Sequence, residues 1–257
     1  MPVMLDVLLY HPVVAPGLGM VLGAILGSFI AALAVRWPLG QSVRHGRSHC
    51  ETCGKTLTPG ELLPILSWLV QRGACRACGA PIGRDALAIE LIAALIGGAS
   101  MLLQPGWTGL GAALFGWLLL PLAWLDLRHY WLPDRLVLVL AMAGAVWGFF
   151  HFPPLLVDRI IGGIAGFFGL AFIASAYRVI RGRDGLGKGD PKLFGAIGIW
   201  LGWAALPFAL LIASGIGLLA VLLAMVRGER PEAANEVPLG ALLALGAWPL
   251  AALPLPL

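Results

Sequence analysis

The sequence predicts an all-α membrane protein, a polytopic bundle of about eight transmembrane helices with a small zinc-ribbon-like loop domain. Three observations lead to this fold class: 60% of the 257 residues are hydrophobic, only 12% are charged, and the apolar residues fall in long runs. An ordinary soluble domain has about 25% charged residues, and a helix needs about 20 largely apolar residues to cross the hydrocarbon core. A soluble protein of this composition would have too few polar groups for its surface.

The apolar runs define the predicted helices. They cover residues 13–35, 87–103, 108–125, 136–150, 157–177, 191–204, 206–226 and 237–255. Residues 1–12 contain no Lys or Arg, and the first run is too long for the apolar region of a cleavable signal peptide. We therefore expect this run to remain as a membrane anchor, with both termini on the same side of the bilayer.

Basic residues predict the orientation of these helices. The loop 37–86 and two stretches on the same predicted side, 178–192 and 227–230, are basic, whereas the opposite side has almost no Lys or Arg. In the large loop the basic residues are Arg44, Arg47, Lys55, Arg72, Arg76 and Arg84. Because basic loops are retained in the cytoplasm, the large loop is predicted to be cytoplasmic. This bias also explains the net charge of +4, so no nucleic-acid partner is expected.

Glycines at four-residue spacing lie on one face of a helix, where they allow a second helix to approach closely. The sequence places such glycines in three predicted helices, and we expect tight packing at each. They are Gly19, Gly23 and Gly27 in the first helix, and the pairs Gly162/Gly166 and Gly198/Gly202 in later ones.

The loop 37–86 is too short for a sizeable apolar core, and domains of this size often need a staple. It contains the only cysteines of the chain, in two Cys-x-x-Cys pairs: Cys50/Cys53 and Cys75/Cys78. This spacing is typical of a tetrahedral zinc site, and Gly54 and Gly79 suit the turn after each pair. Disulfides or a redox pair are the alternative, which the reducing cytoplasm disfavours. Four thiolates leave no position for water, so zinc is expected to be structural.

Two aspartates are candidates for a functional site. Asp126 follows the third apolar run, and Asp190 directly precedes the sixth, at the same predicted membrane face. Ionisable residues near membrane helices are costly and usually functional. Two carboxylates in one site share a proton, so that one can activate water while the other protonates a carbonyl. The alternative for Asp190 is helix capping ahead of Pro191, and capping is favoured for Asp134.

Glycines surround Asp190. We expect Gly187 and Gly189 to adopt positive φ and to leave room for an extended peptide. Lys188 and Lys192 flank the aspartate; they could bind acidic groups of a substrate, but the positive-inside rule already accounts for them.

Together these motifs resemble the type IV prepilin peptidase family over most of the chain. The family's GxGD signature, followed by x-K, appears as Gly187-Lys188-Gly189-Asp190-Pro191-Lys192, and Asp126 with Pro133-Asp134 resembles its other catalytic motif. The family's N-terminal part is similar to Gly27-Ser28-Phe29, Arg36-Trp37-Pro38 and the cysteine loop. The chain departs from the family at Ile30, where asparagine is usual.

The resemblance implies an aspartyl endopeptidase of the bacterial inner membrane that cleaves type IV prepilins or pseudopilins at the cytoplasmic face. Asp126 and Asp190 would form its catalytic dyad, supported by Gly187, Gly189 and Lys192. In bifunctional members it also implies N-methylation of the new terminus from S-adenosylmethionine. The implied division is a first transmembrane helix (1–36), a zinc-binding, methylase-associated loop (37–86) and a membrane-embedded peptidase domain (87–257).

Two other classes of function fit part of the sequence. A small cation-coupled transporter could use both aspartates, but transporters place such sites near the midplane of the membrane. A non-catalytic scaffold that presents a zinc knuckle would explain the cysteines and leave the aspartates without a role.

Overall fold

The computed structural model describes residues 2–40, 48–50, 52–150, 153–182, 185–228 and 237–253. Four basic residues that contribute to the predicted orientation lie outside these ranges: Arg44, Arg47, Arg183 and Arg230. The described residues are mainly helical, and the pairing in them that resembles a sheet is limited to two isolated β-bridges, His49–Thr56 and Ala74–Pro81. The predicted all-α class is confirmed.

One helix corresponds to each predicted apolar run, with ends that differ by up to four residues. These helices are α2 (Val14–Arg36), α4 (Arg84–Leu103), α5 (Trp107–His129), α6 (Asp134–Phe149), α7 (Leu156–Arg181), α8 (Asp190–Leu201), α9 (Leu206–Val226) and α10 (Leu239–Ala252). Three short elements were not predicted: α1 (Pro2–Tyr10), the 3-10 helix η1 (Pro59–Leu62) and α3 (Leu66–Val70).

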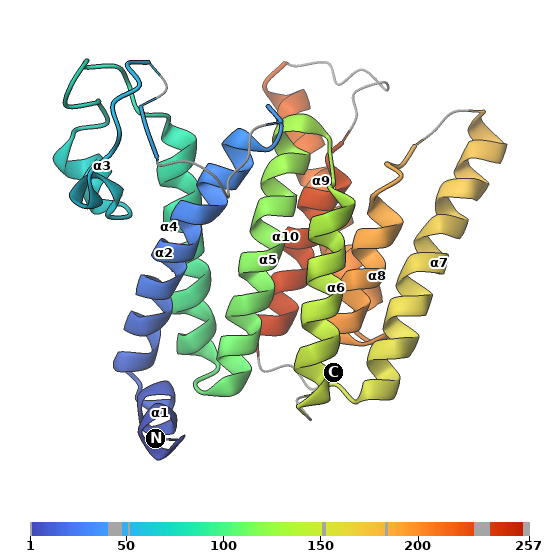
Figure 1. Cartoon of the computed structure of the whole chain (residues 1–257). Coiled ribbons are helices and arrows are strands. Elements are labelled where there is room, and N and C mark those ends of the chain that lie inside the picture. Colours follow the sequence, from blue (N-terminus) through green and yellow to red (C-terminus); the bar gives the residue numbers. More distant parts are fainter. Residues whose placement is uncertain are drawn as a thin grey trace. The chain divides into compact units, whose positions relative to one another are not determined.

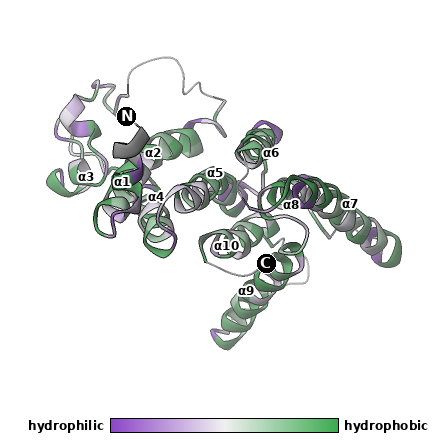
Figure 2. Cartoon of the chain, turned by 90° about the horizontal axis from the view of Figure 1, so that it is seen from below, coloured by the Kyte–Doolittle hydropathy of each residue, from purple (hydrophilic) through white to green (hydrophobic). Residues whose placement is uncertain are grey.

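Five of the described helices, α2, α4, α5, α7 and α9, are long and apolar enough to cross a membrane. The remaining three, α6, α8 and α10, have only 16, 12 and 14 residues. Seen along their axes, the helices carry mainly hydrophobic residues (Figure 2). A multi-pass membrane bundle is therefore confirmed, while the number of eight crossings stays a prediction.

The chain forms two compact units, residues 1–121 and 122–257, which meet at Pro121 inside α5. The threefold division expected from the sequence, at 1–36, 37–86 and 87–257, stays a prediction.

In the first unit α2 and α4 lie side by side along their length (Figure 1). A Cβ atom on Gly19 or Gly23 would collide with the main chain of α4, at Gly97 and Ala93. The predicted packing role of these glycines is confirmed.

The first unit also fixes α1 against the start of α5. The indole Nε1 of Trp107 donates a 3.1 Å hydrogen bond to Oδ1 of Asp6, and the main-chain N–H of Gly106 donates to the carbonyl of Leu9 at 2.9 Å. Leu9 packs in a small buried cluster with Ala15 and Met101. No helix was predicted for this stretch from its sequence.

In the second unit α8 packs against α6, α7 and α10. Gly162 and Gly166 of α7 approach the main chain of α8, where a Cβ on Gly166 would lie 2.7 Å from the carbonyl oxygen of Phe194. Gly198 faces Gly162 in the same crossing. Gly202 belongs to the same approach, because a Cβ on Gly162 would lie 2.7 Å from its carbonyl carbon. It also ends α8, with a φ of +77°.

Arg159 joins three helices at the end of α8 remote from Asp190. Its side chain is only 2% exposed and donates to four carbonyl oxygens, those of Gly144, Pro153, Pro154 and Ile199, at 2.9–3.2 Å. A charged group is tolerated in an apolar interior when its donors are satisfied in this way. Arg159 therefore fixes the C-terminal ends of α6 and α8 against the start of α7.

Candidate active site and metal centre

Asp126 lies in the last turn of α5 and is 5% exposed. Its Oδ2 accepts a 2.8 Å hydrogen bond from the main-chain N–H of Ala241, in the first turn of α10. The helix ends three residues later. Tyr130 follows with a φ of 51°, and its N–H donates a hydrogen bond to the carbonyl of Asp126. A left-handed residue is a common way to end a helix. The end of one helix and the start of another thus hold this carboxylate.

Asp190 is the first residue of α8 and is 4% exposed. Its Oδ2 accepts a 2.8 Å hydrogen bond from the N–H of Gly187, while its own N–H donates to the carbonyl of Gly187 at 3.2 Å. The residue at the N-cap position of α8 is Gly189. The side chain of Asp190 therefore closes the preceding glycine turn, and the capping alternative considered from the sequence is wrong.

The structure brings Asp126 and Asp190 together in the second unit, close enough for the charge of Asp126 to act on Asp190. Neither carboxylate forms an ion pair with Lys or Arg in the described part of the chain. Two buried carboxylates without a counter-charge cannot easily ionise at the same time. The arrangement therefore favours one protonated and one ionised carboxyl group, which is the combination that general acid–base chemistry requires.

Leu132 fills the space beside the two aspartates. A Cβ atom on Gly189 would lie 2.8 Å from Cβ of Leu132. One on Gly240, at the start of α10, would lie 2.9 Å from Cδ1 of Leu132 and 3.0 Å from Oδ2 of Asp126. Gly240, Ala241 and Leu132 were not singled out in the sequence. The sequence signal for Gly240 is a glycine at the start of an apolar run, directly after Pro238-Leu239.

The expectation that Gly187 and Gly189 need positive φ is wrong. Gly189 has a φ of −81°, and Gly187 is not in the left-handed region either. At both positions glycine is required because a larger side chain would meet neighbouring atoms. Gly189 leaves room for Leu132, and Gly187 presents its N–H to the Asp190 carboxylate, which a Cβ there would approach to 3.1 Å.

Lys192 and Asp134 form an ion pair of 2.7 Å between Nζ and Oδ1 at the surface. Asp134 is the first residue of α6, after Pro133 at the N-cap position, and no side chain caps this helix. The predicted capping role of Asp134 is therefore wrong. The pair instead connects the start of α6 to the start of α8, the helix that carries Asp190.

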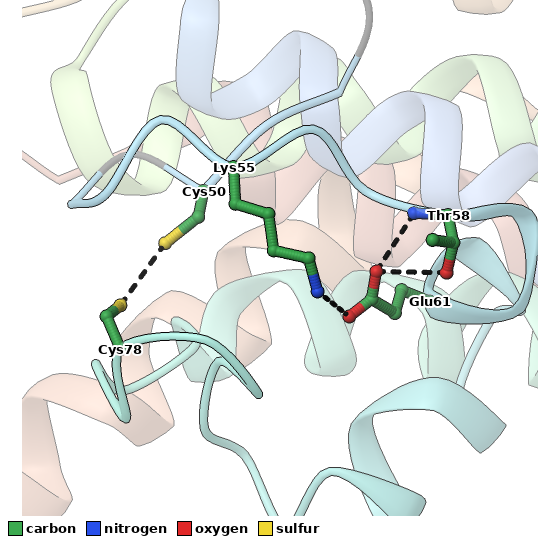
Figure 3. Close-up of polar contacts among 5 residues, drawn as sticks. All are labelled: Cys50, Lys55, Thr58, Glu61 and Cys78. Carbon is green, nitrogen blue, oxygen red and sulfur yellow. Dashed lines mark hydrogen bonds and ion pairs between the residues drawn. The ribbon is translucent and has the colours of Figure 1, made fainter.

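The four cysteines come together in the first unit. Their sulfur atoms all lie within 4.8 Å of one another, with 3.9 Å between Cys50 and Cys78 (Figure 3), and none forms a disulfide. Tetrahedral zinc–thiolate bonds of about 2.3 Å place the sulfurs about 3.8 Å apart. Gly54 and Gly79 both have a φ of 71°, which confirms the predicted turns. The cluster fits a structural zinc ion held by Cys50, Cys53, Cys75 and Cys78.

Main-chain donors favour the thiolate form of Cys50 and Cys75. The N–H groups of Cys53 and Thr52 lower the pKa of Cys50 to about 6, and those of Ala77 and Cys78 lower the pKa of Cys75. Zinc binds the thiolate and not the thiol. Burial and the neighbouring cysteine sulfurs instead raise the pKa of Cys78 to about 11. The main chain therefore favours a thiolate at the first cysteine of each pair.

Glu61 fixes the segment between the two cysteine pairs. Its Oε1 accepts from Nζ of Lys55 at 2.8 Å, and its Oε2 accepts from the N–H and Oγ1 of Thr58, both at 2.9 Å (Figure 3). Lys55 and Thr58 together lower the pKa of Glu61 to about 2. The sequence signal, which sequence reasoning missed, is the capping box of Thr58 with Glu61 three residues later.

A helical membrane bundle that keeps two carboxylates buried next to each other belongs to the class of multi-pass membrane enzymes. Comparison with known proteins makes this specific. Residues 113–222 match the Type IV leader peptidase family, and residues 21–103 match the Bacterial Peptidase A24 N-terminal domain. The chain belongs to the type IV leader peptidase family.

Curated relatives with the name prepilin leader peptidase/N-methyltransferase are similar to most of the chain. The protein from Aeromonas hydrophila is 39% identical over 79% of this chain and 70% of its own length. That from Burkholderia pseudomallei strain K96243 is 36% identical over 88% and 81%, and that from Pseudomonas aeruginosa is 29% identical over 95% and 92%. No solved structure matches the chain.

Proposed function

We propose that the protein cleaves the leader peptides of type IV prepilins or pseudopilins at the cytoplasmic face of the bacterial inner membrane, with Asp126 and Asp190 as the catalytic pair. The observation that carries this proposal is the burial of both carboxylates near one another, with no basic partner among the residues that the structure describes. The names of the relatives support the reaction and the substrate class. Neither the transporter nor the scaffold hypothesis finds support among them.

In the proposed reaction the ionised carboxylate removes a proton from a water molecule, whose oxygen attacks the scissile carbonyl carbon. The protonated carboxyl group donates its proton to the carbonyl oxygen, so that a neutral tetrahedral intermediate forms. Proton return to the leaving amine then breaks the C–N bond. The main-chain donors Ala241 and Gly187 keep each carboxylate oriented through these steps, and the turn from Gly187 to Lys192 lies beside the peptide.

The basic residues of the cysteine loop support its cytoplasmic location. Arg72, Arg76 and Arg84 are exposed, as expected for side chains retained on the inner side of the membrane. We infer that this loop, closed by zinc, supports the second activity in the relatives' name, N-methylation of the new N-terminus. S-adenosylmethionine would supply the methyl group, and we assign no residue to its binding.

The test is cleavage of a prepilin in liposomes by the wild type and by Asp126→Asn, Asp190→Asn and Asp134→Ala. Asparagine keeps the shape of the side chain and an oxygen for the main-chain N–H, but it cannot exchange a proton. We expect cleavage to be lost in both asparagine variants and retained in Asp134→Ala, with all variants equally helical by circular dichroism. Full cleavage by either asparagine variant would contradict the assignment of the pair.

Methylation is tested separately, with S-adenosylmethionine that carries a labelled methyl group and with a pilin whose leader has already been removed. Label on the N-terminal amine of the pilin is the expected result. Cleavage without transfer of label would leave the peptidase assignment intact and remove the methylation proposal.

A further inference from the structure

The cysteine loop exposes a cluster of large apolar side chains. Residues 62–70, called here the leucine segment, include the end of η1 and all of α3. Five of its side chains are between 43% and 67% exposed: Leu62, Leu63, Leu66, Leu69 and Val70. A contiguous apolar cluster on an otherwise polar loop marks a contact with a membrane or with another protein.

The leucine segment is attached to a membrane helix below its cytoplasmic end. Oε2 of Glu90, a buried side chain of α4, accepts a 2.7 Å hydrogen bond from the N–H of Ile65. Glu90 follows Arg84, the first residue of α4, by six positions, or about 9 Å along the helix axis. The apolar run of α4 begins at Leu87, after the charged Arg84 and Asp85, so Glu90 lies about one turn inside the hydrocarbon boundary. Side chains of a helix tilt toward its N-terminus, so the Glu90 carboxylate and the Ile65 N–H that it accepts from lie close to that boundary.

The turn at Ile65 fixes how the segment presents its side chains. Ile65 has φ 63° and ψ −52°, and the N–H of Leu66 bonds to the carbonyl of Pro64, which together form a classic γ-turn. This turn is rare and strained, above all for a β-branched residue. The bond from Ile65 to Glu90 holds the strained residue, while Glu61 anchors the preceding η1 to Lys55.

Basic residues beyond the segment fit a lipid surface. Exposed Arg72 and Arg76 lie two and six positions after its last residue, and exposed Arg84 begins α4. Basic side chains beside an apolar face are the combination that binds the boundary of an anionic leaflet. We propose that the leucine segment lies in the headgroup–acyl boundary of the bilayer and secures the cysteine loop to the membrane surface. This proposal does not depend on the peptidase or methylase activity.

The test uses a fluorescent non-natural amino acid in the full chain, reconstituted in vesicles that contain phosphatidylglycerol with brominated acyl chains. The label replaces Leu66 or Val70, and the matched control carries it at Ala77, an exposed residue of the second cysteine knuckle. Each labelled protein is first checked for wild-type helicity and a single species by size exclusion. A label is not attached through cysteine, so the metal ligands remain intact.

Bromine quenches fluorescence only at short range, so the expected result is several-fold stronger quenching at Leu66 and Val70 than at Ala77. Equal, weak quenching at all three positions would overturn the proposal. So would a label at Leu66 that is unquenched by lipid and changes its emission only when a prepilin is added, because the segment would then bind the substrate.

Discussion

The main-chain N–H of Ala241 donates a 2.8 Å hydrogen bond to Oδ2 of Asp126, although 115 positions separate the two residues. This contact makes the first turn of α10 part of the proposed active site. It supplies orientation through the backbone, so the identity of the side chain at position 241 matters less than the path of the chain.

Gly240→Ala tests that dependence. The new Cβ would lie 3.0 Å from Oδ2 of Asp126 and 2.9 Å from Cδ1 of Leu132, so the carboxylate or the start of α10 must move. Because small displacements of a catalytic group cost up to about 100-fold in rate, we expect prepilin cleavage to fall by at least about tenfold. The matched control is Gly215→Ala in α9, where a Cβ meets no atom within 4 Å. Wild-type rates in both variants would place α10 outside the site.

Gly23→Ala tests the contact of α2 with α4. The added Cβ would collide with the carbonyl of Ala93, and two packed helices can relieve this only by separating. We expect destabilisation of about 1–3 kcal/mol, typical of overpacking, measured as a lower midpoint of thermal unfolding in detergent. Gly17 lies on the same helix with open space around its Cβ, so Gly17→Ala should leave the midpoint unchanged or raise it, because alanine favours a helix over glycine. A midpoint that is the same in both variants would mean that the helices do not pack through Gly23.

Exchange of the charges at Asp134 and Lys192 tests what their ion pair contributes. The two side chains are 71% and 45% exposed, and exposed pairs are worth at most about 1 kcal/mol. Asp134→Lys and Lys192→Asp should each lower cleavage by a few-fold, and the double variant should recover most of it. A double variant as poor as Lys192→Asp alone would show instead that Lys192 acts by itself, for example on the substrate.

Glu61→Gln should weaken the metal centre. Purified wild type is expected to contain one zinc ion per chain, and Cys75→Ser to contain much less. Glutamine in place of Glu61 loses the ion pair with Lys55, so zinc should pass faster to a chelator. A release rate equal to that of the wild type would contradict this role for Glu61.

The contribution of Glu61 to the stability of the fold should not depend on pH near neutrality. The pKa of Glu61 in the fold is about 2, below its usual value of about 4.3. A lowered pKa stabilises the fold fully above the usual value, and that contribution is lost as the pH falls toward 2. The difference in free energy of unfolding between Glu61→Gln and the wild type should therefore be constant between pH 6 and about pH 8.

The helices could be predicted because few backbone conformations are stable in the hydrocarbon of a membrane. A segment in hydrocarbon must satisfy its own main-chain hydrogen bonds, so each long apolar run had to become a helix. The short α1 was missed because its order depends on contacts with Trp107 and Gly106, which lie far away in the sequence. The second role of Gly202, as the residue that ends α8, was missed because glycine spacing does not distinguish a packing face from a helix end.

The residues of the candidate sites divide in the same way. Asp126 and Asp190 could be singled out because a carboxylate beside an apolar run is costly, and the cysteines because metal ligands have a fixed spacing. The groups that donate hydrogen bonds to the two aspartates could not be predicted. The donors at Ala241 and Gly187 are main-chain N–H groups, which every residue but proline has, and only the folded path selects them.

The bond between Ala241 and Asp126 also has a consequence for how the enzyme is made. Asp126 and Asp190 both precede α10 in the chain, so during synthesis each is made before the donor of Asp126. In the proposed active site the geometry of the pair is therefore complete only once the first turn of α10 contacts Asp126.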